Sequence, residues 1–169
     1  MVIEQLALPH QDQFLILIRD FAEHDKKNFL KLFGDKSWDS KAFQKFVKDC
    51  DKQRMDWRPG ADKVSLTHYV LRDHGVICGY GRMRFPLDDE TEKHGGNLEF
   101  YVPPGKRGHG YGTLTLNRML FEAVKAGMAR ALVTCLAGDT AAIRCVEKNR
   151  GERVDDGDKI TTRFWIRFR

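Results

Sequence analysis

Long hydrophobic runs are missing from this 169-residue sequence. No window approaches the roughly 18 consecutive apolar residues that a membrane-spanning helix needs. Residues 1–5 also lack the charge pattern of a signal peptide. The sequence therefore predicts no membrane partner and a cytoplasmic location. Its 41% apolar content is enough for the core of one domain over residues 1–169.

Metal-binding patterns are missing as well. The four cysteines, at positions 50, 78, 135 and 145, form no C-x-x-C pair, and the six histidines show no H-x-x-x-H spacing. Such spacings are typical of structural metal sites, so we expect no metal. The cysteines are expected to be buried, reduced thiols, which is typical of cytosolic proteins.

Blocks of like charge and internal repeats are also absent. The net charge is +5, but the positive charge is spread over the whole chain, without a run of roughly five or six basic residues. This distribution does not favour nucleic acid as the main partner. A basic regulatory domain that binds nucleic acid through its backbone phosphates is kept as the least favoured alternative.

What the chain does contain is a glycine-rich turn after residue 104. Gly108, Gly110 and Gly112 alternate with larger residues, between an apolar run over 98–102 and a helical pattern that starts near Tyr111. Such a turn leaves backbone N–H groups unpaired at a helix N-terminus, where an anion binds them. With the charges of Lys106 and Arg107 beside it, the turn is predicted to be a phosphate cradle.

Two familiar phosphate motifs do not fit this turn. A Walker A loop requires Lys and Ser or Thr directly after its last glycine, whereas Gly110 precedes Tyr111 and Gly112 precedes Thr113. The dinucleotide pattern G-x-G-x-x-G fails from Gly108, because position 113 is Thr, and from Gly110, because position 115 is Thr. The remaining match is Arg/Gln-x-x-Gly-x-Gly/Ala, satisfied by Arg107, Gly110 and Gly112.

The periodicities predict an α/β domain. Residues 9–24 and 40–50 have helical spacing, with Ser40 as a possible cap of the second helix, and residues 57–60 read as a breaker. Residues 64–71 and 76–85 read as a hairpin, in which Gly79 and Gly81 suggest a bulge or a close approach of another backbone. Residues 88–92 read as an acidic loop. Two apolar strands separated by the helix that starts near Tyr111 predict a parallel βαβ unit.

With these flanking segments, the chain resembles the GNAT superfamily of acyl-CoA-dependent N-acyltransferases. The signature at Arg107, Gly110 and Gly112 follows Val102-Pro103-Pro104, and the strand over 132–136 precedes a short helix. That helix contains Asp139 and Ala142 and ends in Glu147-Lys148-Asn149, before Gly151. The resemblance covers residues 64–169, the expected acetyl-CoA-binding core. Residues 1–60 are expected to form N-terminal helices, either over the site entrance or simply as an amphipathic layer on the sheet.

The resemblance implies a mixed central sheet, with antiparallel N-terminal strands and a parallel, splayed central pair, flanked by helices. It implies acetyl-CoA as the acyl donor, an amine as the acceptor, and allows a homodimer. The residues implied to bind the coenzyme follow from the matching positions: Phe100, Tyr101, Val102, Arg107, Gly108, His109, Gly110, Tyr111, Gly112, Thr113 and Asp139. Asp139 stands where the family has an Asn that bonds the pantetheine arm; it can equally cap the following helix.

Glu99 and Tyr101 are the candidate catalytic residues. Glu99 lies in an otherwise apolar strand, where burial would raise its pKa toward that of a general base; the alternative is a carboxylate paired with Arg or Lys. Val146 stands where the family has a general-acid Tyr. Either Tyr101, Tyr80 or Cys145 replaces it, or the thiolate leaves unassisted, which a thiol pKa of about 8.5 allows.

The predicted function is transfer of an acetyl group from acetyl-CoA to a primary amine of a small molecule, amino acid or peptide, by direct attack on the thioester. The alternative is a related module that binds acyl-CoA without catalysis, which Val146 and Ala142 would favour.

Overall fold

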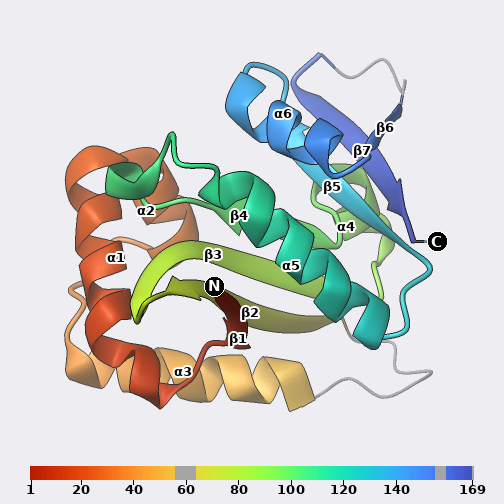
Figure 1. Ribbon diagram of the computed structural model, residues 1–169. Helices are drawn as coiled ribbons and strands as arrows, with labels where there is room; N and C mark the ends of the chain where they lie inside the picture. The colour runs from red at the N-terminus through yellow and green to blue at the C-terminus, as the bar shows by residue number, and fades with distance from the viewer. Residues whose placement is uncertain (56–63, 155–158, 169) are drawn as a thin grey trace.

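The computed structural model describes residues 1–55, 64–154 and 159–168. The predicted breaker at residues 57–60 lies outside this part. The strands described form a single sheet with the spatial order β1-β2-β3-β4-β5-β7-β6 (Figure 1). Their bounds are β1 Val2–Gln5, β2 Ser65–Asp73, β3 Val76–Phe85, β4 Leu98–Tyr101, β5 Arg130–Leu136, β6 Glu152–Val154 and β7 Thr161–Arg167.

Helices cover the sheet and connect its strands (Figure 1). The α-helices are α1 Gln11–His24, α2 Lys26–Phe33, α3 Ser40–Met55, α4 Asp89–His94, α5 Tyr111–Lys125 and α6 Thr140–Lys148; the short 3-10 helices are η1 Leu8–His10 and η2 Pro104–Lys106. No helix in the described ranges is both long and apolar enough to cross a membrane.

The strand pairing confirms the predicted mixed sheet. Antiparallel pairs join β1 to β2, β2 to β3 and β3 to β4. β5 and β6 each pair antiparallel with β7. β4 and β5 are the parallel pair, and their ladder has one register pair, Leu98 with Val133. The sheet is therefore interrupted at its centre, directly before the predicted cradle.

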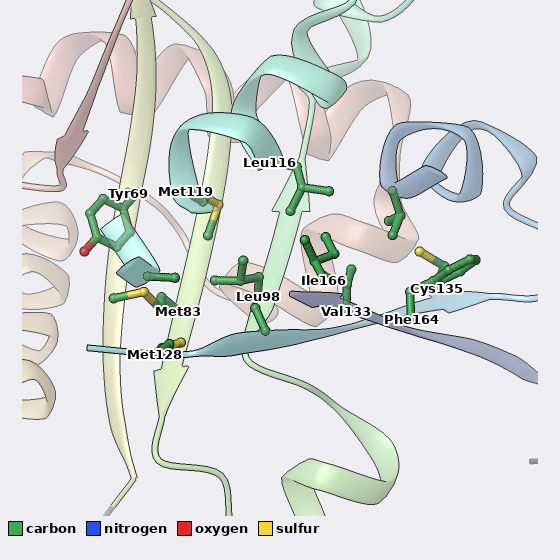
Figure 2. Packing of buried hydrophobic residues seen from close by; sticks show 13 residues of the cluster. Tyr69, Met83, Leu98, Leu116, Met119, Met128, Val133, Cys135, Phe164 and Ile166 are labelled. Atoms are coloured by element: carbon green, nitrogen blue, oxygen red, sulfur yellow. The ribbon is translucent and has the colours of Figure 1, made fainter. Parts of the chain in front are cut away.

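Helix α5 packs closely against one face of the sheet. A Cβ on Gly79 would lie 2.0 Å from Thr115 Oγ1, and a Cβ on Gly81 would lie 2.1 Å from Met119 Sδ. The sequence suggested a bulge or a close approach of another backbone at these glycines, but the nearest atoms belong to side chains of the helix. The β2–β3 ladder also shifts register beside Gly79. Figure 2 shows the resulting core, in which Leu116 and Met119 of α5 pack with residues of β4 and β5.

The N-terminal helices cover the opposite face. The sheet therefore has a hydrophobic core on each face. Neighbouring side chains of β2 point to opposite faces, so Tyr69 packs in the core under α5 and Val70 in the core under α1 to α3. Phe14 of α1 is fully buried, and its ring centroid lies 5.5 Å from those of Phe43 and Tyr80. Aromatic rings therefore connect the N-terminal helices to β3, next to the central strand.

Several local expectations need correction. The acidic run at 88–92 is not a loop, because Asp88 and Thr91 form a reciprocal capping box that starts α4. Asp39 rather than Ser40 caps α3, since its carboxylate accepts the N–H of Ala42 at 2.7 Å. The short edge strands β1 and β6 gave too little periodicity to be predicted.

Candidate active site

The predicted phosphate cradle lies between β4 and α5. Gly108 and Gly110 have φ angles of +83° and +80°, a left-handed conformation that favours glycine. The first hydrogen bond of α5 joins Leu114 N–H to Gly110 C=O at 3.2 Å. The N–H groups of residues 108–113 precede this bond, so they are the helix-end donors that an anion can accept. A Cβ on Gly108 or Gly110 would meet no atom within 4 Å, so open space adjoins the turn.

The N-terminal helices hold the cradle in place. Asp20 of α1 accepts the N–H of Gly105 at 2.8 Å, and Asp25, the N-cap of α2, accepts from Arg107 Nη2 at 2.5 Å. Burial acts to raise the pKa of Asp25, but its hydrogen bonds from Arg107 and Asn28 outweigh burial and lower that pKa. The N–H of Arg107 itself bonds to Pro104 C=O at 3.2 Å. The donors available to an anion therefore start at Gly108, although the sequence signature starts at Arg107.

A cavity of about 620 Å³ opens beside the cradle. Its wall combines the turn, the end of β4, the start of α2 and one face of α6. The basic lining residues outnumber the acidic ones, as a ligand with several phosphates requires: Lys27, Lys106, Arg107, Arg144 and Lys148 against Asp25 and Asp139. We call this the larger cavity, to distinguish it from a smaller neighbouring cavity described below. The predicted residues Phe100, Tyr101, Val102, Arg107, Gly108, Gly110, Tyr111, Gly112, Thr113 and Asp139 all line it.

His109 differs from the other predicted coenzyme residues. It is exposed, does not line the larger cavity, and its Nδ1 lies 2.8 Å from Arg107 C=O. Its contribution to the cradle is therefore its backbone N–H. Asp139 has the capping role that the sequence left open: it is the N-cap of α6, and its carboxylate accepts the N–H of Ala142 at 2.9 Å.

A second cavity of about 180 Å³ adjoins the first. Asn28, Phe100, Tyr101, Leu136, Asp139 and Ala142 line both. The smaller cavity alone contacts Lys31 of α2, Glu99 of β4 and Thr134 of β5. The two cavities therefore meet at Phe100 and Tyr101, beyond the point where β4 and β5 stop pairing.

Glu99 is not the weakly acidic carboxylate that was predicted. Arg82 donates to Glu99 Oε2 through Nε at 2.8 Å and also through Nη2, and Arg84 Nη1 donates to Oε1 at 2.8 Å. Burial acts to raise the pKa of Glu99, but the two guanidinium charges and the hydrogen bond from Arg82 lower it to about 2. The expected rise in pKa is wrong, and the paired alternative describes this carboxylate.

Tyr101 is the tyrosine of β4 that contacts both cavities. Its hydroxyl donates to Glu99 Oε2 at 3.0 Å, and burial, followed by the Glu99 charge, raises its pKa. Tyr80 is fully buried, and its hydroxyl lies 2.5 Å from His68 Nδ1. Burial lowers the pKa of His68 to about 3, so this pair is neutral. Tyr80 therefore belongs to the aromatic core and lines neither cavity.

Val146 faces away from the cavities. Its side chain is fully buried in the core beneath α6, and a Cβ on Gly151 would lie 2.4 Å from Val146 Cγ1. Its neighbour Cys145 instead lines the larger cavity, where the thiol accepts a hydrogen bond from Thr113 Oγ1 at 3.5 Å.

Sequence reasoning missed several lining residues. Ala141, Arg144 and Lys148 lie at i, i+3 and i+7, on the same face as Cys145, which the sequence had singled out, so this face could have been found from helical spacing. The lining residues of α2 carry no such signal, because only the chain's fold brings that helix to the cradle.

Comparison with known proteins agrees with this geometry. No curated protein sequence matches the chain. Among solved structures, a ribosomal-protein-alanine N-acetyltransferase from Brucella melitensis is similar, with a TM-score of 0.64, 17% identity and 98% coverage of both chains. An N-acetyltransferase from Staphylococcus aureus has a TM-score of 0.64 and 13% identity, covering 98% of this chain and 97% of its own. The yncA protein from Salmonella typhimurium, solved with its cofactor acetyl-CoA, has a TM-score of 0.61 and 13% identity, covering 99% and 92%.

These structures establish the fold, and a family model establishes the family. The model of the acetyltransferase (GNAT) family matches residues 35–151, which include β2 to β5, the cradle and α6. Since the match spans well over half of the sequence, the chain belongs to the acetyltransferase (GNAT) family.

Proposed function

We propose that this protein transfers an acetyl group from acetyl-CoA to a primary amine of a small molecule, amino acid or peptide. The observation that carries the proposal is the continuity of the site. The cradle opens into the larger cavity, which meets the smaller cavity where β4 and β5 separate. A long phosphate-bearing donor and a small acceptor can therefore meet at Phe100 and Tyr101.

The larger cavity supplies what the donor needs. The phosphates of acetyl-CoA would accept hydrogen bonds from the N–H groups of residues 108–113. Lys106, Arg144 and Lys148 would provide positive charge at the rim of the cavity. The pantetheine amides of acetyl-CoA would bond the backbone of residues 100–102, at and just beyond the end of β4, which no longer pairs with β5. One N–H of that segment would polarise the thioester carbonyl and stabilise the tetrahedral oxyanion.

Proton transfer would not use Glu99 as the base. A carboxylate with a pKa of about 2 is a poor acceptor for the proton of an ammonium group, whose pKa is about 10.4 for a lysine side chain. The acceptor would instead attack as the neutral amine present at equilibrium. The new C–N bond displaces the coenzyme thiolate, the amine proton passes to solvent, and a thiol pKa of about 8.5 makes unassisted departure feasible.

The similar structures agree with this reaction class. The Salmonella protein was solved with acetyl-CoA, and the Brucella protein is named for acetylation of a ribosomal-protein alanine. At these identities the likeness supports the fold, so a peptide α-amine is one acceptor within the proposed range.

The test is release of free thiol from acetyl-CoA over a panel of amines, alongside calorimetric binding of coenzyme A. Turnover with at least one amine supports the proposal. Binding without turnover would indicate an acyl-CoA-binding module, and absence of both would leave the cradle to another phosphate ligand.

A further inference from the structure

The smaller cavity has an excess of positive charge. Lys31, Arg82 and Arg84 lie near two carboxylates: Asp139 in the cavity wall, and Glu99, whose two oxygens already accept from both guanidinium groups and from the Tyr101 hydroxyl. The side chains of Arg82 and Glu99 are only 13% and 15% exposed. Three cations and two carboxylates leave a net charge of +1 at this end of the sheet.

Lys31 contributes the charge that borders the cavity directly. Its Nζ lies 5.5 Å from the centre of the Tyr101 ring, and Lys31 lines the smaller cavity. Among the described residues, no carboxylate lies within 4.0 Å of Nζ. The Tyr101 hydroxyl interacts with this ammonium, which has three N–H donors and so keeps others for a ligand.

Thr134 provides a second, independent sign of a missing ligand. Its Oγ1 is buried, and no hydrogen-bond partner for it exists in the part of the chain that the structure describes. Thr134 lines the same cavity as Lys31. A buried hydroxyl without a partner is destabilising, and a bound acceptor oxygen would remove that cost.

We infer that the acceptor is a small amine that carries a carboxylate, bound by the Lys31 ammonium and the Thr134 hydroxyl. The inference rests on the proposed function and specifies its substrate class. A carboxylate offers acceptor oxygens to both groups and compensates the net positive charge. The volume of about 180 Å³ suits a small molecule.

The test measures acceptor binding separately from turnover. Glycine, β-alanine and 4-aminobutyrate are titrated calorimetrically into the complex of the protein with coenzyme A, each beside its neutral amide. At least one carboxylate should bind about tenfold or more tightly than its amide. Lys31→Met should abolish that difference. Lys45→Met, which removes an exposed lysine paired with Asp49 on α3, should retain it.

Thr134→Val separates binding from folding. Removing an unpartnered hydroxyl should leave the free energy of unfolding unchanged or higher, while carboxylate affinity falls severalfold. Equal binding of amides and carboxylates, no binding of either, or a preference that survives Lys31→Met would overturn the inference. Tighter binding of 2-aminoethyl phosphate than of every carboxylate would also overturn it, in favour of a phosphate group. Thiol release with neutral amines tests the proposed function independently of these results.

Discussion

Asn97 bonds Leu132 in both directions. The N–H of Asn97 donates to Leu132 C=O, and the Asn97 side-chain Oδ1 accepts the N–H of Leu132, each at 2.8 Å. The Asn97 amide also donates to Arg84 C=O at 3.1 Å. A single buried side chain thus joins β3, β4 and β5 just before the point where β4 and β5 separate.

Asn97→Ala should destabilise the protein by about 2 kcal/mol, because the buried N–H of Leu132 and C=O of Arg84 lose their partners. Urea unfolding measures this change. Gln53→Ala, which truncates an exposed amide on α3, should change stability by less than about 0.5 kcal/mol. Equal effects of the two substitutions would contradict the joining role of Asn97.

Gly110→Val should weaken coenzyme A binding strongly. The substitution forces a β-branched residue to φ near +80° and puts its side chain in the space beside the cradle. Gly127→Val is the matched control, because Gly127 has φ of +84° and open space at the opposite end of α5. Both variants should lose stability, but only Gly110→Val should lose affinity in calorimetric titration.

Arg107→Ala should reduce coenzyme affinity less than Gly110→Val. The Arg107 side chain is held by Asp25 and by Val102 C=O, so its main effect is on the position of the loop. An affinity loss as large as that of Gly110→Val would mean that side-chain charge, rather than the turn's N–H groups, anchors the phosphates.

Glu99 should stabilise the fold through its ionised form. Its pKa falls from 4.5 to about 2 on folding, so the contribution is fully present above pH 4.5 and is lost as the pH drops toward 2. The shift corresponds to about 3 kcal/mol. In unfolding experiments across this pH range, the Glu99→Gln variant should not show this loss of stability with falling pH. Glu23→Gln, an exposed change on α1, should still show it.

The same shift governs the pH–rate profile. Because the Glu99 pKa lies far below neutral pH, the acidic limb of kcat/KM should follow the acceptor amine and move when the amine is changed. A limb that stays fixed across amines and disappears in Glu99→Gln would restore Glu99 as the general base.

The alkaline side of the profile tests Tyr101. If the thiolate leaves unassisted, the rate should stay flat above about pH 9 once the amine is neutral. If Tyr101 protonates the sulfur, the rate should fall at high pH. That fall should occur at a pH above the usual tyrosine range, because the pKa of Tyr101 is raised. We predict the flat profile; a decline that is lost in Tyr101→Phe would refute it.

Val146→Tyr should destabilise the fold rather than restore a general acid. Val146 is fully buried against Gly151 and Phe164, so a phenol there would overpack the core. The free energy of unfolding should fall by about 3 kcal/mol. Thermal unfolding measures the effect. Ala141→Tyr, on the exposed cavity side of the same helix, should leave stability nearly unchanged. A stable and faster Val146→Tyr enzyme would show that the helix can turn this position toward the site.

The sequence alone determined the features that depend on local chemistry. The glycine spacing at 108, 110 and 112 predicted the turn, because Gly108 and Gly110 adopt a left-handed conformation with open space beside them, and Gly112 leaves room for Cys145. The helix between two apolar strands predicted the parallel pair, and Gly79 and Gly81 suggested a bulge or a close contact, of which the structure has a register shift and helix side chains. The cytoplasmic location and the homodimer remain predictions.

Only the tertiary structure decided the chemistry of the side chains. Glu99 alone in an apolar strand predicts a raised pKa, but the β3–β4 register places Arg82 opposite it and brings Arg84 close enough to bond it, which reverses the shift. The position of Val146 in the core, and that of Lys31 beside the smaller cavity, likewise depend on how α6 and α2 pack. A backbone turn is specified by neighbours along the chain, whereas a pKa depends on charges that folding brings from distant segments.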